Sequence, residues 1–100
     1  MKNKLHVFTM LGFAQKAGKI VSGESAVKAM LNKGQIHLII MAEDLSENRK
    51  KFWSYLALQS RIPVSIIGTK QELGIAIGLS PRAIIGITDL QMAKSIELKM

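Results

Sequence analysis

Residues 18–28 read Gly-Lys-Ile-Val-Ser-Gly-Glu-Ser-Ala-Val-Lys, and this stretch decides the fold. Its apolar residues predict a short strand over 19–21, and the glycine that follows predicts a tight turn. Ser22 is expected to cap a helix that ends at Gly34, because a serine oxygen can accept a hydrogen bond from an early backbone N–H. The inward face of this helix is expected to carry four apolar residues, Ala26, Val27, Met30 and Leu31.

Alternating helices and strands are expected on both sides of this stretch. Apolar residues at helical spacing predict a helix before it, and an almost wholly apolar run predicts a central strand after it. Capping residues at Ser46, Thr69 and Asp89 predict three more helices. The expected helices span 3–17, 22–34, 46–59, a short segment after Thr69, and 89–98, and the expected strands span 19–21, 36–42, 64–68 and 83–88. This order predicts one α/β domain over residues 1–100, with helices on both faces of a sheet.

The charge of the chain is strongly positive and unevenly distributed. Fourteen Lys and Arg residues stand against seven Asp and Glu residues, which gives a net charge of +7. Residues 1–41 contain one acid, Glu24, and six lysines: Lys2, Lys4, Lys16, Lys19, Lys28 and Lys33. This distribution indicates one basic face, and nucleic acid is the first ligand to expect. The alternative is a lysine-rich surface without a partner.

The composition excludes several function classes. The chain has no cysteine, which excludes disulfides, thiolate zinc sites and cysteine nucleophiles. His6 and His37 lack metal-ligand spacing, so no metal site is expected. No apolar run reaches the ~18 residues of a membrane span, and no signal-peptide core follows the first lysines. We therefore expect a cytoplasmic protein that has no cofactor, no membrane contact and no small-molecule substrate.

The start of the helix after Ser22 is the first candidate binding site. Its first turn leaves backbone N–H groups without internal partners, which suits an anionic ligand. Gly23 has no side chain, so another backbone can approach closely. Further side chains are expected around it: Lys16 and Lys19 before the turn, and Ser25, Lys28 and Asn32 on one face of the helix. The alternative is an ordinary amphipathic helix with an internal Glu24–Lys28 ion pair.

Two later segments are also candidate sites. The Glu43-Asp44 pair stands where a strand leaves the sheet, a place where carboxylates can bind a metal or act as acid and base. Turn and helix-cap duty is the commoner role for such a pair. The loop Gly78–Arg82 offers Leu79 as an apolar contact and Arg82 as a phosphate or stacking group, which suits an unstacked nucleotide. Its alternative is a plain connector whose Leu79 folds inward.

Enzyme motifs are absent from the sequence. The run Arg49-Lys50-Lys51 fans around a helix, so it is expected on a solvated face. The glycines of 69–78 lack the spacing and the lysine of a phosphate-binding loop. No nucleophile elbow and no Ser–His–acid set is present. The sequence therefore gives little support to an enzyme.

The chain resembles the kink-turn-binding ribosomal protein family, and within it the bacterial YlxQ-type RNA-binding proteins. The stretch Ala-Gly-Lys-x-Val-x-Gly-Glu at residues 17–24 is similar to the YlxQ-type subgroup. The ordered segments that carry the resemblance are Leu11–Lys19, Ser22-Gly23-Glu24, Ala42-Glu43-Asp44, Ile62-Pro63-Val64, Glu72-Leu73-Gly74, Gly78 and Ile85–Asp89. The resemblance implies a three-layer α/β/α sandwich around a mixed four-stranded sheet. It also implies binding to sharply bent RNA that contains tandem sheared G·A pairs.

The resemblance also implies where RNA would bind. The family pattern on the second helix is Gly-x-Asn-Glu-x-x-Lys. Aligned on Gly23, this pattern places Ser25 at the Asn position, Ala26 at the Glu position and Ala29 at the Lys position. Lys28 stands one residue before that lysine position, and Lys33 matches a later basic position. The family loop that holds a flipped-out nucleotide corresponds to residues 79–84.

The function predicted from the sequence is non-catalytic binding of structured RNA, either ribosomal RNA or another kink-turn RNA, with the ribosome as a further candidate partner. Phosphate contacts are expected from Lys16, Lys19, Lys28, Lys33 and Arg82. Close approach and base contacts are expected from Gly23, Glu24 and Ser25, and support for an extruded base from Leu79 and Ile84. One alternative is a protein-interaction subunit that docks on a ribosomal or RNA-processing factor without reading RNA. The other is a small enzyme centred on Glu43 and Asp44.

Overall fold

The computed structural model describes residues 3–100 and contains alternating helices and strands. Lys2 lies outside the described residues. The expected order of elements is confirmed, with ends that differ from the expected ones by one or two residues. The helices are α1 (Lys4–Lys16), α2 (Glu24–Asn32), α3 (Glu47–Gln59), α4 (Lys70–Ala76) and α5 (Leu90–Glu97), and the strands are β1 (Ile20–Ser22), β2 (Leu38–Met41), β3 (Val64–Ile66) and β4 (Ile84–Ile87).

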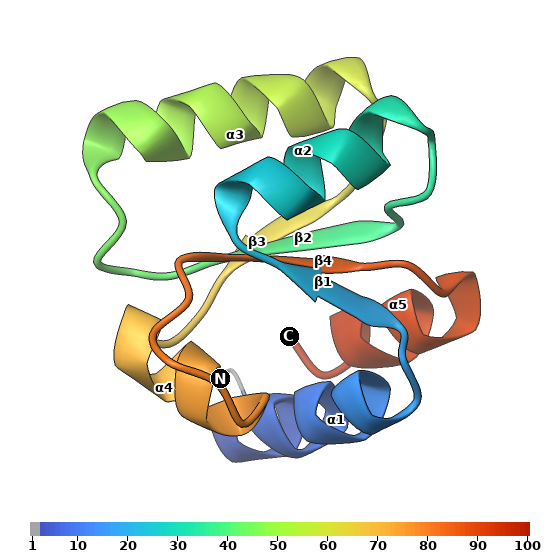
Figure 1. The fold of residues 1–100 in the computed structure, drawn as a ribbon, viewed down its shortest axis with the longest axis vertical. Helices are drawn as coiled ribbons and strands as arrows, with labels where there is room; N and C mark the ends of the chain where they lie inside the picture. Colours follow the sequence, from blue (N-terminus) through green and yellow to red (C-terminus); the bar gives the residue numbers. More distant parts are fainter. Residues whose placement is uncertain (1–2) are drawn as a thin grey trace.

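The four strands form one mixed sheet in the order β1-β4-β2-β3. Strand β4 runs antiparallel to β1 and to β2, whereas β2 and β3 are parallel. Helices α2 and α3 cover one face of the sheet, and α1, α4 and α5 cover the other (Figure 1). The α/β/α sandwich that the family resemblance implies is therefore confirmed.

The strand directions give the sheet two distinct ends. Strands β1, β2 and β3 finish at the end where β4 begins, and there the Gly23 N–H donates to the Ile84 carbonyl at 2.9 Å. We call this the Gly23 end. At the opposite end the Thr88 N–H donates to the Lys19 carbonyl at 2.9 Å. We call this the Lys19 end, and Figure 1 shows the two ends on opposite sides of the molecule.

The central strands β2 and β4 are buried along their whole length, as a continuous apolar run predicts. Alternate residues of β2 enter two separate cores. Ile39 and Met41 pack toward α2 and α3, around the fully buried Trp53. Leu38 and Ile40 pack toward α1, α4 and α5. Within the described residues, no helix has the length and apolar character needed to cross a membrane.

Two details of the α2 region differ from the expectation. Ser22 is the last residue of β1, where it pairs with Ile85, so the expected serine cap is wrong. Gly23 occupies the cap position instead, with φ of +90°, a conformation that favours glycine. Ala26 is exposed rather than inward, because the helix rests on the row formed by Val27 and Leu31.

Candidate nucleic-acid interface

The start of α2 is open to solvent and carries no side-chain cap. Gly23 makes no side-chain cap hydrogen bond, whereas Asn3, Ser46, Thr69 and Asp89 cap the other described helices. Ser25 is exposed, and a Cβ added at Gly23 would find no atom within 4 Å. Uncapped N–H groups give a helix start a partial positive charge. This helix start can therefore receive an anion or a closely approaching backbone.

Glu24 ties the start of α2 to α3. Its Oε1 atom accepts from the Nε of Arg49 at 3.0 Å, from a second Arg49 nitrogen, and from the indole Nε1 of Trp53 at 2.7 Å. The alternative of a Glu24–Lys28 pair is wrong, because the ion pairs of the described residues join Glu24 to Arg49 and leave Lys28 out. The Lys28 ammonium lies 5.6 Å from the centre of the Phe52 ring. Arg49 also stacks on that ring, at 4.3 Å, so the prediction of a merely solvated face is wrong for Arg49.

These contacts lower the pKa of Glu24 from its ordinary value of 4.5. The hydrogen bond from Arg49 is the largest cause, partial burial opposes it, and the bond from Trp53 adds to it. The carboxylate thus stays ionised and holds the helix in place. Its charge is balanced by Arg49, so Glu24 contributes little net negative charge to the surface.

We expect Glu24→Gln to destabilise the fold by about 1 kcal/mol at pH 7, since a charge-assisted bond at a partly exposed site is lost. The unfolded chain takes up the Glu24 proton at a higher pH than the folded chain does. Stability from this group is therefore present above pH 4.5 and is lost as the pH falls through the lowered pKa. Urea unfolding measured from pH 7 to pH 3 should show that the free energy of unfolding falls less steeply with pH in this variant than in the parent. The same substitution at the exposed Glu97, which has no ion pair in the described structure, should leave the pH dependence unchanged.

The loop between α4 and β4 lies beside the start of α2. The Nε of Arg82 donates to the Ser22 hydroxyl at 3.1 Å, across 60 residues of sequence. Its Nη1 donates to the Ser80 hydroxyl at 2.7 Å and to the carbonyls of Ser80 and Pro81. None of these contacts uses Nη2, so the N–H donors of Nη2 are left for a ligand. Leu79 in the same loop is 41% exposed, so the alternative of an inward Leu79 is wrong.

Gly74 of α4 holds this loop against the helix. The Leu79 N–H donates to the Gly74 carbonyl at 2.8 Å. A Cβ at Gly74 would lie 2.4 Å from the Ser80 carbonyl oxygen and 2.9 Å from that of Leu79. Only glycine permits this approach, and it fixes where Leu79 and Arg82 are presented.

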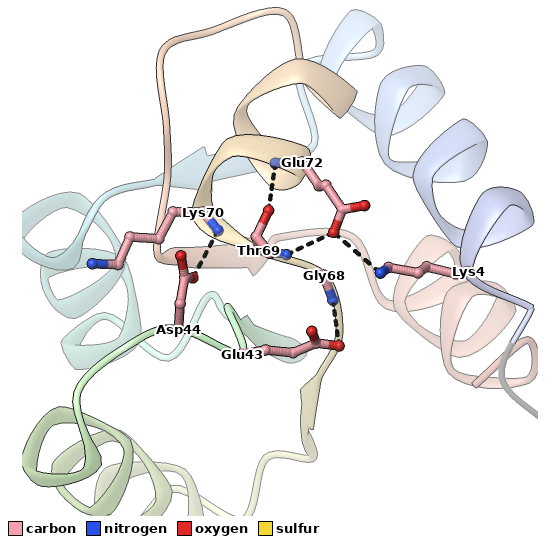
Figure 2. Close-up of polar contacts among 7 residues, drawn as sticks. All are labelled: Lys4, Glu43, Asp44, Gly68, Thr69, Lys70 and Glu72. Atoms are coloured by element: carbon pink, nitrogen blue, oxygen red, sulfur yellow. Dashed lines mark hydrogen bonds and ion pairs between the residues drawn. The ribbon is translucent and has the colours of Figure 1, made fainter.

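Glu43 and Asp44 connect β2 to the start of α4, as Figure 2 shows. Glu43 Oε1 accepts from the Gly68 N–H at 3.3 Å, and Asp44 Oδ1 accepts from the Lys70 N–H at 2.9 Å. The prediction of turn and cap duty is confirmed. The described residues contain no group of three or more His, Asp or Glu side chains placed to hold a metal ion.

Lys70 is a cation of this surface that the sequence reasoning missed. Its carbonyl accepts from the Arg82 N–H at 3.0 Å, so the two residues are direct neighbours. Its ammonium makes no ion pair in the described structure, and its side chain reaches away from the Asp44 carboxylate (Figure 2). The capping box of Thr69 and Glu72 marked this helix start in the sequence. Only the strand order shows that the loop before β4, which contains Arg82, lies beside this helix start.

The structure does not gather all the expected cations around the start of α2. The Lys19 carbonyl accepts from the Thr88 N–H at the opposite end of β4. Lys16, the last residue of α1, and Lys33, the C-cap residue of α2, lie at that same end. The expectation of one cationic cluster is therefore wrong, because α2 runs back from the Gly23 end to the Lys19 end. Ile84 is 0% exposed and belongs to the core, so the support that it was expected to give to an extruded base is indirect. The expected and newly found site residues in the first half of α2, at the start of α4 and in the loop before β4 are named the α2-start surface here. They are Gly23, Ser25, Lys28, Lys70, Leu79 and Arg82.

The sequence model of the ribosomal protein L7Ae/L30e/S12e/Gadd45 family matches residues 6–97 of the chain. The chain belongs to this family.

Two known proteins are similar to the chain in sequence. The RNA-binding protein YlxQ of Bacillus subtilis is 29% identical over 89 residues, which are 89% of each protein. The large ribosomal subunit protein eL8 of Picrophilus torridus is 26% identical over 84 residues, which are 83% of this chain and 66% of the relative. The recognition of the family from the sequence is confirmed.

Two solved structures share the fold. A Bacillus halodurans protein of unknown function superposes with a TM-score of 0.89 at 30% identity, covering 92% of this chain and 93% of that one. The 15.5kD RNA binding protein of Giardia lamblia superposes with a TM-score of 0.76 at 19% identity, covering 96% and 88%. The second likeness concerns the fold alone.

This member of the L7Ae/L30e/S12e/Gadd45 family presents small side chains on α2. Ser25, Ala26 and Ala29, which the family resemblance is expected to place at the Asn, Glu and Lys positions of its pattern, are all exposed. The carboxylate of Glu24 does not replace the missing one, because it is turned toward Arg49 and Trp53. The surface therefore offers backbone and cations more than base-reading side chains.

Proposed function

We propose that this protein is a non-catalytic RNA-binding protein whose preferred target is a kink-turn. The proposal is supported by membership of the L7Ae/L30e/S12e/Gadd45 family and by the names of its YlxQ relatives. The observation that carries it is the hydrogen bond from Arg82 to Ser22, which sets the Leu79–Arg82 loop beside the open start of α2. A helix start and a cationic, partly apolar loop suit two parts of one bent RNA.

Each part of the α2-start surface has a distinct role in this proposal. The open N–H groups and the cations Lys28, Lys70 and Arg82 contact phosphates. Gly23 allows the RNA backbone to come close, and Ser25 contacts a base edge. The exposed Leu79 supports an unstacked base, and the Nη2 donors of Arg82 lie in the same loop. Glu24 acts indirectly, by holding the start of α2 on α3.

The preference for a kink-turn is expected to be modest. A good bidentate base contact gives about 1–3 kcal/mol of discrimination. Serine and alanine at positions 25, 26 and 29 supply fewer such contacts than the family pattern does. Shape and phosphate placement therefore contribute most of the discrimination.

Direct titration of two RNAs tests the proposal. The first contains a kink-turn, and the second is a straight duplex of equal length and charge. We expect about ten-fold tighter binding of the kink-turn at the same salt concentration, equivalent to one lost contact of about 1.4 kcal/mol. Equal affinity for the two would reject the kink-turn preference. Failure to bind either RNA would reject RNA binding and favour the protein-docking alternative.

A further inference from the structure

Four chain segments meet at the Lys19 end of the sheet. The Lys19 carbonyl, in the turn between α1 and β1, accepts from the Thr88 N–H after β4. The His37 N–H, just before β2, donates to the Ile87 carbonyl of β4 at 2.8 Å. The residues before β3 are joined to β2 by the Ile39 N–H, which donates to Pro63 at 3.0 Å. The four segments therefore lie next to one another at the side of the molecule away from the α2 start (Figure 1).

The acidic residues are concentrated at the other end. Because α2, α3 and α4 begin at the Gly23 end, acids that cap or flank helix starts accumulate there. Five acids lie at that end: Glu24, Glu43, Asp44, Glu47 and Glu72. The three ion pairs in the described part of the chain also lie there, and they involve Lys4, Arg49 and Lys50.

The Lys19 end carries more cations than acids. Lys16, Lys19 and Lys33 are exposed, and none makes an ion pair in the described structure. Arg61, just before β3, adds a fourth positive charge. Asp89, whose Oδ2 accepts from the Met92 N–H at 2.9 Å, is the acid at this end and offsets one of the four positive charges. A positive potential therefore extends from this end into solvent.

We infer that the Lys19 end is a second phosphate-binding surface, which contacts the backbone of an RNA arm that extends beyond the kink-turn. This inference rests on the proposed function at the α2-start surface. Helix α2 has nine residues, so its start and its end are about 14 Å apart at a rise of 1.5 Å per residue. An RNA arm of a few base pairs beyond the bend spans that distance. Lysines bind phosphate as point charges, so this contact adds affinity without sequence preference.

The test uses the variant Lys16→Gln/Lys19→Gln/Lys33→Gln and two kink-turn RNAs, one minimal and one with a long arm. We expect the variant to bind the long-armed RNA at least ten-fold more weakly than the parent does. Its salt dependence, the slope of log K against log salt, should fall by about three, or one for each lost phosphate contact. Binding of the minimal RNA should change by less than about two-fold, because that RNA reaches only the α2-start surface.

The control variant is Lys51→Gln/Lys94→Gln/Lys99→Gln, which removes the same charge from three other exposed lysines. It should bind the long-armed RNA like the parent, and an equal loss in both triple variants would overturn the inference. An unchanged affinity and salt slope in the first variant would also overturn it. If the parent does not prefer a kink-turn over a straight duplex, the proposed function fails separately. In that case, weaker duplex binding by the Lys16/Lys19/Lys33 variant but not by the control variant would still support a phosphate-binding surface at the Lys19 end.

Discussion

Arg82→Ala is expected to weaken kink-turn binding by about five-fold to one hundred-fold, which corresponds to roughly 1–3 kcal/mol. The substitution removes a cation and also releases the loop from β1, because the bond from Arg82 to Ser22 is lost. Electrophoretic or fluorescence titration at fixed salt measures the change. Circular dichroism should show that the fold is retained, since Arg82 lies outside both core clusters.

Three variants separate the charge of Arg82 from its positioning role. Arg82→Lys keeps the charge but loses the planar fork, so we expect an intermediate affinity. Ser22→Ala removes the acceptor of the Arg82 Nε without altering charge, so a smaller loss is expected. Lys99→Ala, at an exposed lysine outside the α2-start surface, should leave binding unchanged. Parent-like affinity for Arg82→Ala would remove this residue from the proposed site.

Gly74→Ala is expected to lower the free energy of unfolding by about 1–3 kcal/mol and to weaken RNA binding. The new Cβ would stand 2.4 Å from the Ser80 carbonyl oxygen, so the loop must move away from α4. That movement displaces Leu79 and Arg82 from the start of α2. Alanine favours a helix by about 1 kcal/mol over glycine, which offsets only part of the cost. Urea unfolding and the RNA titration measure the two effects.

Gly12→Ala is the matched comparison for this prediction. It is also a helical glycine, but its Cβ would lie 3.2 Å from the Ala76 carbonyl, a much milder contact. We expect a smaller change in stability and no change in RNA affinity. Equal affinity of Gly74→Ala and parent protein for kink-turn RNA would show that the position of the loop does not matter for binding.

The candidate site was predictable from the sequence only in part. The glycine turn at Gly23, the loop with Leu79 and Arg82, and the capping duty of Glu43 and Asp44 follow from local signals. The absence of a side-chain cap on α2 does not, because Ser22 was expected to provide one. The partner of Glu24 was not predictable, because Arg49 and Trp53 stand 25 and 29 residues away. Lys70 was missed for the same reason, since its neighbour Arg82 belongs to another strand's loop.

By itself, the sequence determined the order of helices and strands, the caps at Ser46, Thr69 and Asp89, and the burial of β2 and β4. These features depend on residue spacing, backbone preference and hydrogen bonds within a few residues. Only the tertiary structure decided which charges stand together. The insertion of β4 between β1 and β2 brings Arg82 to the α2 start and leaves Lys16, Lys19 and Lys33 at the far end. Strand order depends on contacts between distant segments, and no local periodicity encodes it.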